Sequence, residues 1–78
     1  MITVKLFGLL RLDTGLRELT VEAANIRQLK REILRATDRI TKENLGGCVI
    51  LVNGAPCKPW TKLKDGDQVT LLPPVAGG

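Results

Sequence analysis

One stretch of this chain, residues 26–36, has clear helical periodicity, and it is the feature that most limits the possible folds. Asn25 precedes it, and Asn is among the residues that favour a helix N-cap. The apolar side chains of the stretch recur at the three- and four-residue intervals of one helix face: Ile26, Leu29, Ile33 and Leu34. Residues 41–45 predict only a short turn or 3₁₀ piece. A 78-residue chain with one such helix must complete its core with strands.

The first two predicted strands lie before this helix. Aliphatic side chains alternate with other residues over residues 2–7, which predicts a strand with one aliphatic face. The opposite face is polar except for Phe7. Residues 16–22 alternate more loosely. Residues 13–15 have turn composition, so we expect the two segments to form a β-hairpin across a short break.

The remaining strands follow the helix. Residues 48–52 form a short, continuous aliphatic run, which predicts a buried strand. The pair Asn53-Gly54 is typical of a tight hairpin turn. A Pro-containing connection, for which we expect Trp60 and Leu63 to provide anchors, leads to a last strand over residues 68–72.

This order of elements predicts an α+β fold. One helix would cover one face of a mixed sheet of four to five strands. The first and last strands would lie side by side, because the helical crossover leaves the central positions of the sheet for them. Only two residues are aromatic, so the core must be aliphatic. We expect one domain over residues 1–72 and a flexible tail over residues 73–78.

The composition argues against a self-contained catalytic or metal site. The chain has no His, which is the commonest general base and metal ligand. Two cysteines cannot complete a four-ligand zinc site, so we expect no metal. Cys48 begins an apolar run and is expected to be buried, whereas Cys57 lies between prolines in an expected loop. The two could form a disulfide, although a cytoplasmic setting would disfavour one.

The hydropathy pattern predicts a soluble protein. No apolar run reaches the roughly 18 residues of a membrane span. The start of the chain lacks the pattern of a signal peptide. We therefore expect a cytoplasmic location and no membrane partner.

The positive charge is concentrated in one part of the chain. The formal net charge is +4, and half of the 12 basic residues fall between positions 25 and 43: Arg27, Lys30, Arg31, Arg35, Arg39 and Lys42. Such a cluster can be a solvated helix face, a nucleic-acid patch or a docking surface for an acidic protein. The sequence lacks other signals of nucleic-acid binding, such as aromatic residues on a sheet that could stack on bases. Their absence disfavours the nucleic-acid patch.

The C-terminus has its own character. Pro73 and Pro74 cannot donate to a sheet, so the last strand should end at Leu72. The prolines favour a stiff extended path, along which the last six residues would reach roughly 18–20 Å. Gly77 and Gly78 have no side chains, so such a tip could enter a channel too narrow for other residues. A frayed chain end is the alternative.

Three motifs along the chain, taken together, are typical of one family: Asn53-Gly54, Leu63-Lys64-Asp65-Gly66-Asp67, and Pro73-Pro74-Val75-Ala76-Gly77-Gly78. With them the whole chain resembles the MoaD/ThiS family of ubiquitin-like sulfur carriers, which implies a β-grasp fold. It is most similar to the small subunit of molybdopterin synthase, because thiamine-pathway relatives usually lack the Pro-Pro pair. That subfamily often has aromatics before Pro-Pro, where this chain has Leu71 and Leu72.

The resemblance implies that the reactive group is the carboxylate of Gly78. A ubiquitin-activating-like adenylyltransferase would adenylate it with ATP, and a persulfide sulfur would convert it into a thiocarboxylate. The large subunit of molybdopterin synthase would then receive the tail: Pro73, Pro74, Val75, Ala76 and Gly77. On this hypothesis the chain binds no cofactor stably and donates sulfur, while its partners supply the catalytic side chains.

Strand alternation predicts where a partner would dock. If the aliphatic residues of the first and last strands face the helix, Phe7 and Leu72 face outward and could form an apolar docking surface. Single exposed apolar residues on a small sheet are the alternative explanation.

Three other functions remain open at this point. The chain could carry sulfur for another pathway, namely thiamine, cysteine or tRNA thiolation. It could be a ubiquitin-like modifier joined through Gly78 to other proteins. It could also be a basic nucleic-acid-binding module whose tail is incidental.

Overall fold

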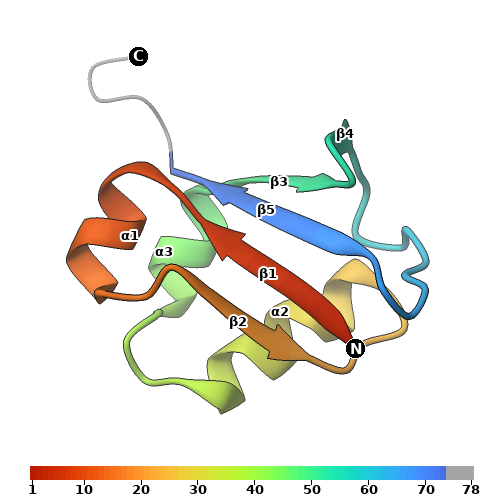
Figure 1. Cartoon of the computed structure of the whole chain (residues 1–78), viewed down its shortest axis with the longest axis horizontal. Coiled ribbons are helices and arrows are strands. Elements are labelled where there is room, and N and C mark those ends of the chain that lie inside the picture. The colour runs from red at the N-terminus through yellow and green to blue at the C-terminus, as the bar shows by residue number, and fades with distance from the viewer. Residues whose placement is uncertain (74–78) are drawn as a thin grey trace.

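The computed structural model describes residues 1–73, which form a five-stranded mixed sheet and three helices (Figure 1). The elements in chain order are β1 (Ile2–Leu6), α1 (Gly8–Thr14), β2 (Glu18–Val21), α2 (Ile26–Ala36), α3 (Lys42–Gly47), β3 (Val49–Val52), β4 (Ala55–Pro56) and β5 (Gln68–Leu72). The strand order across the sheet is β2-β1-β5-β3-β4. This arrangement is the predicted α+β, β-grasp architecture, with α2 packed on one face of the sheet (Figure 1).

The first and last strands form the centre of the sheet, as predicted. β1 and β5 run parallel, with Leu6 beside Leu71. β2 flanks β1 on one side and β3 flanks β5 on the other, both antiparallel. The end of β5 is therefore hydrogen-bonded on both sides, which fixes the direction in which the chain leaves the sheet.

The core lies between the sheet and α2. Every second residue of the two central strands is buried against the helix: Ile2, Val4, Leu6, Val69 and Leu71. From α2, Ile26, Leu29 and Ile33 meet them. The helix begins and ends where the sequence predicted, and the side chain of Asn25 accepts a hydrogen bond from the backbone N–H of Gln28 at 2.8 Å. No helix of residues 1–73 is long and apolar enough to span a bilayer.

The connection between β1 and β2 differs from the prediction. β1 and β2 are paired antiparallel, but the expected short break is preceded by the helix α1. The turn composition at residues 13–15 belongs to the C-terminus of that helix, where Gly15 adopts a left-handed conformation with φ of 72°. Leu10 and Thr14, one turn apart, are buried, and the Thr14 hydroxyl donates to the carbonyl of Leu10 at 2.7 Å. The burial of Leu10 and Thr14 thus stabilises α1. The turn-forming residues 13–15 do not by themselves predict this helix.

The piece after α2 is also more regular than predicted. α3 is a helix rather than a turn, and it includes Gly46 and Gly47 as its last residues. Thr41 and Asn44 cap it reciprocally: each side chain accepts the backbone N–H of the other at 3.1 Å. This capping box satisfies N–H groups that a short helix otherwise leaves unpaired.

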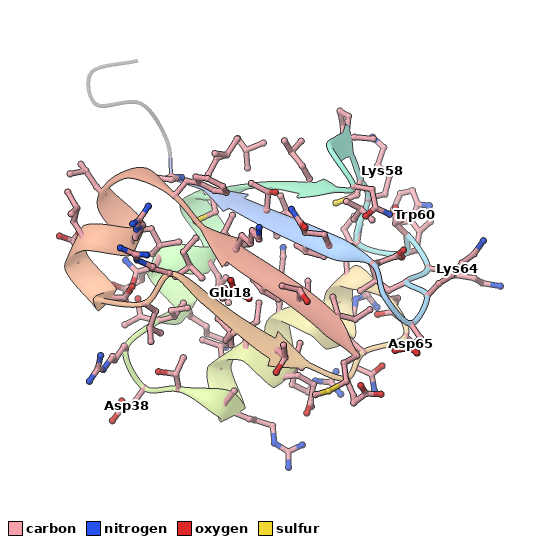
Figure 2. All side chains as sticks on the ribbon, viewed as in Figure 1. Glu18, Asp38, Lys58, Trp60, Lys64 and Asp65 are labelled. Carbon is pink, nitrogen blue, oxygen red and sulfur yellow. The ribbon has the colours of Figure 1, made fainter. Side chains whose placement is uncertain are left out.

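Two expectations about the second half of the chain are wrong. β3 is a strand, as predicted, but it is only partly buried, because its outer face carries no helix and its neighbour β4 has just two residues. Leu63 anchors the connection before β5, whereas Trp60 does not, since 71% of its surface is exposed (Figure 2). The polar backbone of the loop is satisfied without it: Ile26 and Arg27 donate to carbonyls of Thr61 and Pro59.

Candidate functional site

The candidate site is built around the point where β5 ends and the tail begins. β5 ends at Leu72, as the prolines predicted, and Leu72 lies opposite Val49 of β3. On the other side, the N–H of Phe7 donates to the carbonyl of Leu71 at 3.2 Å, so β1 and β5 stay paired up to this point. The base of the tail is therefore held by both neighbouring strands.

A glycine that the sequence analysis did not single out shapes this exit. Gly8 begins α1, separated from β1 by Phe7 alone, and has a φ of +60°, a conformation that residues with side chains rarely adopt. A Cβ atom at this position would lie 3.0 Å from Cγ of Pro73. Gly8 thus allows the chain to turn into α1 while Pro73 packs against it. A Gly immediately after a predicted strand was the available signal.

The sheet face away from α2 carries an apolar surface beside this exit. The backbone of Phe7 is extended, with φ of −130° and ψ of 167°, so strand alternation directs its side chain away from the buried Leu6. Phe7 is 41% exposed, and Leu72 beside it is half-buried. From β3, Val49 and Leu51 belong to the same face. We call these four residues the outer patch: Phe7, Val49, Leu51 and Leu72.

The structure places Phe7 and Leu72, the two residues predicted for docking, beside each other, and it places Val49 and Leu51 on the same sheet face. Phe7 and Leu72 are neighbours across the parallel β1–β5 pair, in the register that sets Leu6 beside Leu71. Val49, which is 54% exposed, was missed because a continuous aliphatic run was taken to be buried on both faces. Its register opposite Leu72 shows that alternate residues of the run face outward. The sequence could have indicated this only through the two-residue alternation of faces expected of any strand over residues 48–52.

Five of the predicted site residues, Pro74 to Gly78, lie outside the described residues. Their role stays a prediction. Pro73 is described, and it lines a hollow of about 180 Å³ together with residues of α1 and α3. The tail therefore starts between the outer patch and these two short helices.

Two other motifs of the predicted family have a structural role at the opposite end of β5, where Figure 2 labels Lys64 and Asp65 of one of them. The Asn53-Gly54 turn has positive φ at both residues, as the predicted tight hairpin requires. The amide of Asn53 donates to Asp67 at 3.1 Å and accepts from the backbone N–H of Gln68 at 3.0 Å. The other carboxylate oxygen of Asp67 accepts the N–H of Lys64 at 2.8 Å. These bonds join the turn before β4 to the turn before β5.

The same network changes the ionisation of Asp67. Hydrogen bonds from the backbone of Lys64 and from the side chain of Asn53 stabilise the carboxylate and lower the pKa of Asp67 below its ordinary value. Asp67 therefore stays charged at neutral pH and keeps its bonds. The motif thus holds the start of β5, at the opposite end of the strand from Leu72.

The two thiols show no sign of activation. Burial raises the pKa of Cys48 and of Cys57, and for Cys57 the nearby Lys30 offsets this only in part. The thiol of Cys48 donates to the carbonyl of Asn44, and that of Cys57 to the carbonyl of Ile50. Both are free and half-buried. Within residues 1–73, no three Cys, Asp or Glu side chains gather as metal ligands.

Comparison with known proteins identifies the family. The model of the ThiS family matches residues 4–78. The chain belongs to the ThiS family. No curated protein matched it.

Solved structures agree with this assignment. In a complex of subunits 1 and 2 of the molybdopterin-converting factor from Helicobacter pylori, a chain is 35% identical, with a TM-score of 0.74 over 99% of this chain and 97% of that one. SAMP1 from Haloferax volcanii is 24% identical, with a TM-score of 0.86 over 99% and 98%, and shows the same fold. A BexX/CysO complex from Amycolatopsis orientalis has a chain 26% identical, with a TM-score of 0.76 over all of both chains.

These likenesses establish a ThiS-type, ubiquitin-like sulfur-carrier fold. Two of the three structures are complexes with a second protein, as their names state. Such complexes agree with the expectation that a chain of this type works with a partner protein. The three relatives differ in name, so the family alone does not select one sulfur pathway.

Proposed function

We propose that this chain is a sulfur carrier whose Gly78 carboxylate is converted into a thiocarboxylate and supplies sulfur for the dithiolene of molybdopterin. It acts as the small subunit of a molybdopterin synthase in the cytoplasm. The observation that carries the proposal is the exit of β5: a ThiS-family chain ending in Gly77-Gly78 leaves the central strand β5, which is paired on both sides, next to the outer patch. A partner can hold the patch while the tail reaches into its active site.

The chemistry requires activation by another enzyme. An α-carboxyl group has a pKa of about 3.3–3.7 and is a poor electrophile when ionised at neutral pH. A ubiquitin-activating-like adenylyltransferase joins this carboxylate to the α-phosphate of ATP and releases pyrophosphate. A persulfide sulfur then attacks the carbonyl carbon, and AMP leaves. Cleavage of the resulting S–S bond by a thiol leaves the thiocarboxylate on Gly78.

The residues of the chain agree with a donor role. A carrier needs no general base of its own, and the chain has no His and no activated thiol among residues 1–73. What it must provide is a docking surface and a tail of small cross-section. Pro73, Pro74, Val75, Ala76 and Gly77 supply the length between the sheet and the reactive carbonyl.

The molybdopterin pathway is favoured over the others by two observations. The Pro-Pro pair before the tail resembles the molybdopterin branch, and the 35% identical relative is named as part of a molybdopterin-converting factor. A carrier for thiamine, cysteine or tRNA thiolation would share the first chemical steps. A ubiquitin-like modifier would share the adenylate but end in an isopeptide bond.

Transfer to a pterin precursor tests the pathway. The thiocarboxylated chain is incubated with a molybdopterin synthase large subunit and the sulfur-free cyclic pterin precursor, and dithiolene formation is followed. We expect product with the full chain and none with a variant that lacks Gly78. Stable binding to the large subunit without any sulfur transfer would rule out this pathway while leaving the carrier chemistry to be tested by the mass measurement below.

A further inference from the structure

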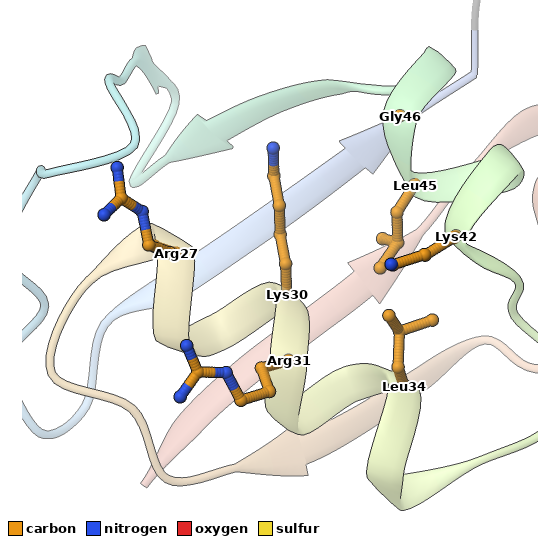
Figure 3. A pocket seen from close by; sticks show the side chains of 7 residues that line it. All are labelled: Arg27, Lys30, Arg31, Leu34, Lys42, Leu45 and Gly46. Carbon is orange, nitrogen blue, oxygen red and sulfur yellow. The ribbon is translucent and has the colours of Figure 1, made fainter.

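A groove between the helices α2 and α3 has no part in the function proposed above. It has a volume of about 460 Å³ and lies between α2 and α3 (Figure 3). Pockets that hold small molecules commonly measure about 300–1,000 Å³, so a groove of this size has room for a few side chains of a partner. The residues that line it are Arg27, Lys30, Arg31 and Leu34 from α2, and Lys42, Leu45 and Gly46 from α3.

Helix periodicity explains why cations gather here. Arg27, Lys30 and Arg31 occupy positions i, i+3 and i+4 of α2, and Leu34 follows at i+7. These four therefore form one stripe, next to the stripe that packs into the core. Lys42 extends from the facing helix α3 (Figure 3). The groove is rimmed by four positive charges, and no carboxylate lines it.

The other two basic residues of this region already have partners. Arg35 forms an ion pair with Glu32 at 3.4 Å. Arg39 donates to the carbonyl of Thr14 at 3.3 Å and so caps α1. By contrast, the four cations of the groove form no ion pair with any of residues 1–73. The charge of the groove is therefore not neutralised by a carboxylate of residues 1–73.

The floor of the groove is aliphatic. Leu34 and Leu45 point toward one another across the gap between the two helices (Figure 3). Leu45 is buried in the core, and Leu34 is half-buried, so its remaining surface faces the groove. An apolar floor with a cationic rim matches a helix or peptide that presents aliphatic residues flanked by Asp and Glu.

We propose that the α2–α3 groove docks an acidic, aliphatic-anchored segment of a partner protein. The occupant is argued from charge complementarity: its carboxylates would neutralise the rim, and one or two of its aliphatic side chains would cover Leu34. An aliphatic floor offers bases no ring to stack on, which favours a protein segment over nucleic acid. The helices α2 and α3, which line the groove, lie behind the sheet (Figure 1), whereas the outer patch belongs to the sheet face away from α2, so both can be occupied together.

A designed peptide tests the groove directly. The probe is the blocked peptide ELEDLLEEIEDE, which places its aliphatic residues at helical spacing among acidic ones. It is titrated into the isotope-labelled full chain, and amide shifts are followed by NMR. We expect saturable shifts centred on Arg27, Lys30, Arg31, Leu34 and Gly46, and an affinity that falls as salt is added.

Three control probes separate the contributions. Replacing the acidic residues by Lys, or the aliphatic residues by Ala, should weaken binding at least tenfold in each case. A 20-nucleotide oligouridine at the same salt concentration is the nucleic-acid control, and we expect it to bind more weakly than the acidic peptide. Trp60, the only tryptophan, lies in a hollow that Arg27 also lines, so its fluorescence provides a second readout.

Charge reversal locates the site. The double variant Lys30→Glu and Arg31→Glu should weaken peptide binding roughly tenfold or more. The matched control, Arg11→Glu and Arg17→Glu, changes the net charge equally at exposed cations outside the groove and should retain binding. If the first pair disturbs folding, Lys42→Glu on α3 provides an independent test.

Four results would overturn the proposal. They are an absence of saturable shifts, equal binding of all three peptides, tighter binding of the oligouridine, or equal losses in the two double variants. None of them bears on the thiocarboxylate chemistry, because the groove and the tail are tested separately.

Discussion

The two faces of the sheet differ in what covers them, and adjacent residues of β5 show the difference. Leu71 faces α2 and is fully buried, whereas Leu72 faces outward and is half-buried beside Phe7. Both are Leu in the same strand, one peptide bond apart. The inner face stabilises the fold, and the outer face retains apolar surface that the chain does not need for folding. The comparison separates residues that hold the molecule together from those available to a partner.

The largest expected effect is the loss of Leu71. Leu71→Ala should destabilise the fold by about 2–5 kcal/mol, because it leaves a cavity between the sheet and α2. The core of a domain this small supplies only about 3–5 kcal/mol, so the variant should be largely unfolded. Urea unfolding followed by circular dichroism measures this. Leu72→Ala is the matched control and should cost less than about 1 kcal/mol; equal losses would contradict the division between the faces.

The next effect concerns the turn at the base of the tail. Gly8→Ala should cost about 1–2 kcal/mol for the left-handed backbone. It should also displace Pro73, whose Cγ would lie 3.0 Å from the new methyl group. NMR shifts at Leu72 report the displacement. Gly15→Ala has a comparable φ of +72°, but its nearest atom is the flexible end of Arg39 at 3.5 Å.

The Gly15→Ala control should lose a similar amount of stability and leave Leu72 unshifted. If both variants shift Leu72 alike, the contact between Gly8 and Pro73 does not position the tail.

Replacing Phe7 should change the stability of the fold little but strongly weaken binding to the partner. Phe7→Ala should weaken binding to the large subunit about tenfold or more, since aromatic anchors dominate interfaces. The change in stability should stay below about 1 kcal/mol because the side chain is partly exposed. Calorimetric titration and urea unfolding give the two values. Leu12→Ala, an exposed aliphatic side chain on α1, should change neither; unfolding of Phe7→Ala would show that Phe7 belongs to the core.

The smallest effect lies at the start of β5. The pKa of Asp67 is lowered in the folded chain, so its bonds stabilise the fold above the ordinary value of 3.8. This contribution is lost as the pH falls below that value, because the carboxylate becomes protonated and no longer accepts both bonds. Melting temperatures measured from neutral pH downward should therefore decline less steeply for Asp67→Asn than for the native chain. Asp38→Asn is the exposed control and should retain the native slope.

The sequence predicts much of the fold because its strongest signals act locally. The helical stripe of α2, its Asn25 cap and the Asn53-Gly54 turn are each encoded by a few neighbouring residues, and all three are as predicted. The pairing of β1 with β5 is also predictable from the order of the elements, because a single helical crossover allows few arrangements of the strands in the sheet. α1 could not be predicted, because burial of Leu10 and Thr14 depends on distant residues.

The candidate site was predictable only in part for the same reason. Alternation places Phe7 and Leu72 on the outer face, and register then makes them neighbours. The contribution of Val49 depends on the short β4, which leaves one side of β3 with little cover. The contact of Gly8 with Pro73 joins residues at opposite ends of the chain, which no local pattern encodes.

The proposed function depends on a reactive carboxylate at Gly78. Intact-mass measurement after incubation with ATP, a persulfide sulfur source and the cognate adenylyltransferase detects the conversion of this carboxylate into a thiocarboxylate. We expect the mass gain of one oxygen of Gly78 replaced by sulfur, and no mass gain in the variant that lacks Gly78. An unchanged mass, with no adenylate and no sulfur adduct although the enzyme adenylates a second ThiS-family carrier in the same assay, would exclude this chemistry.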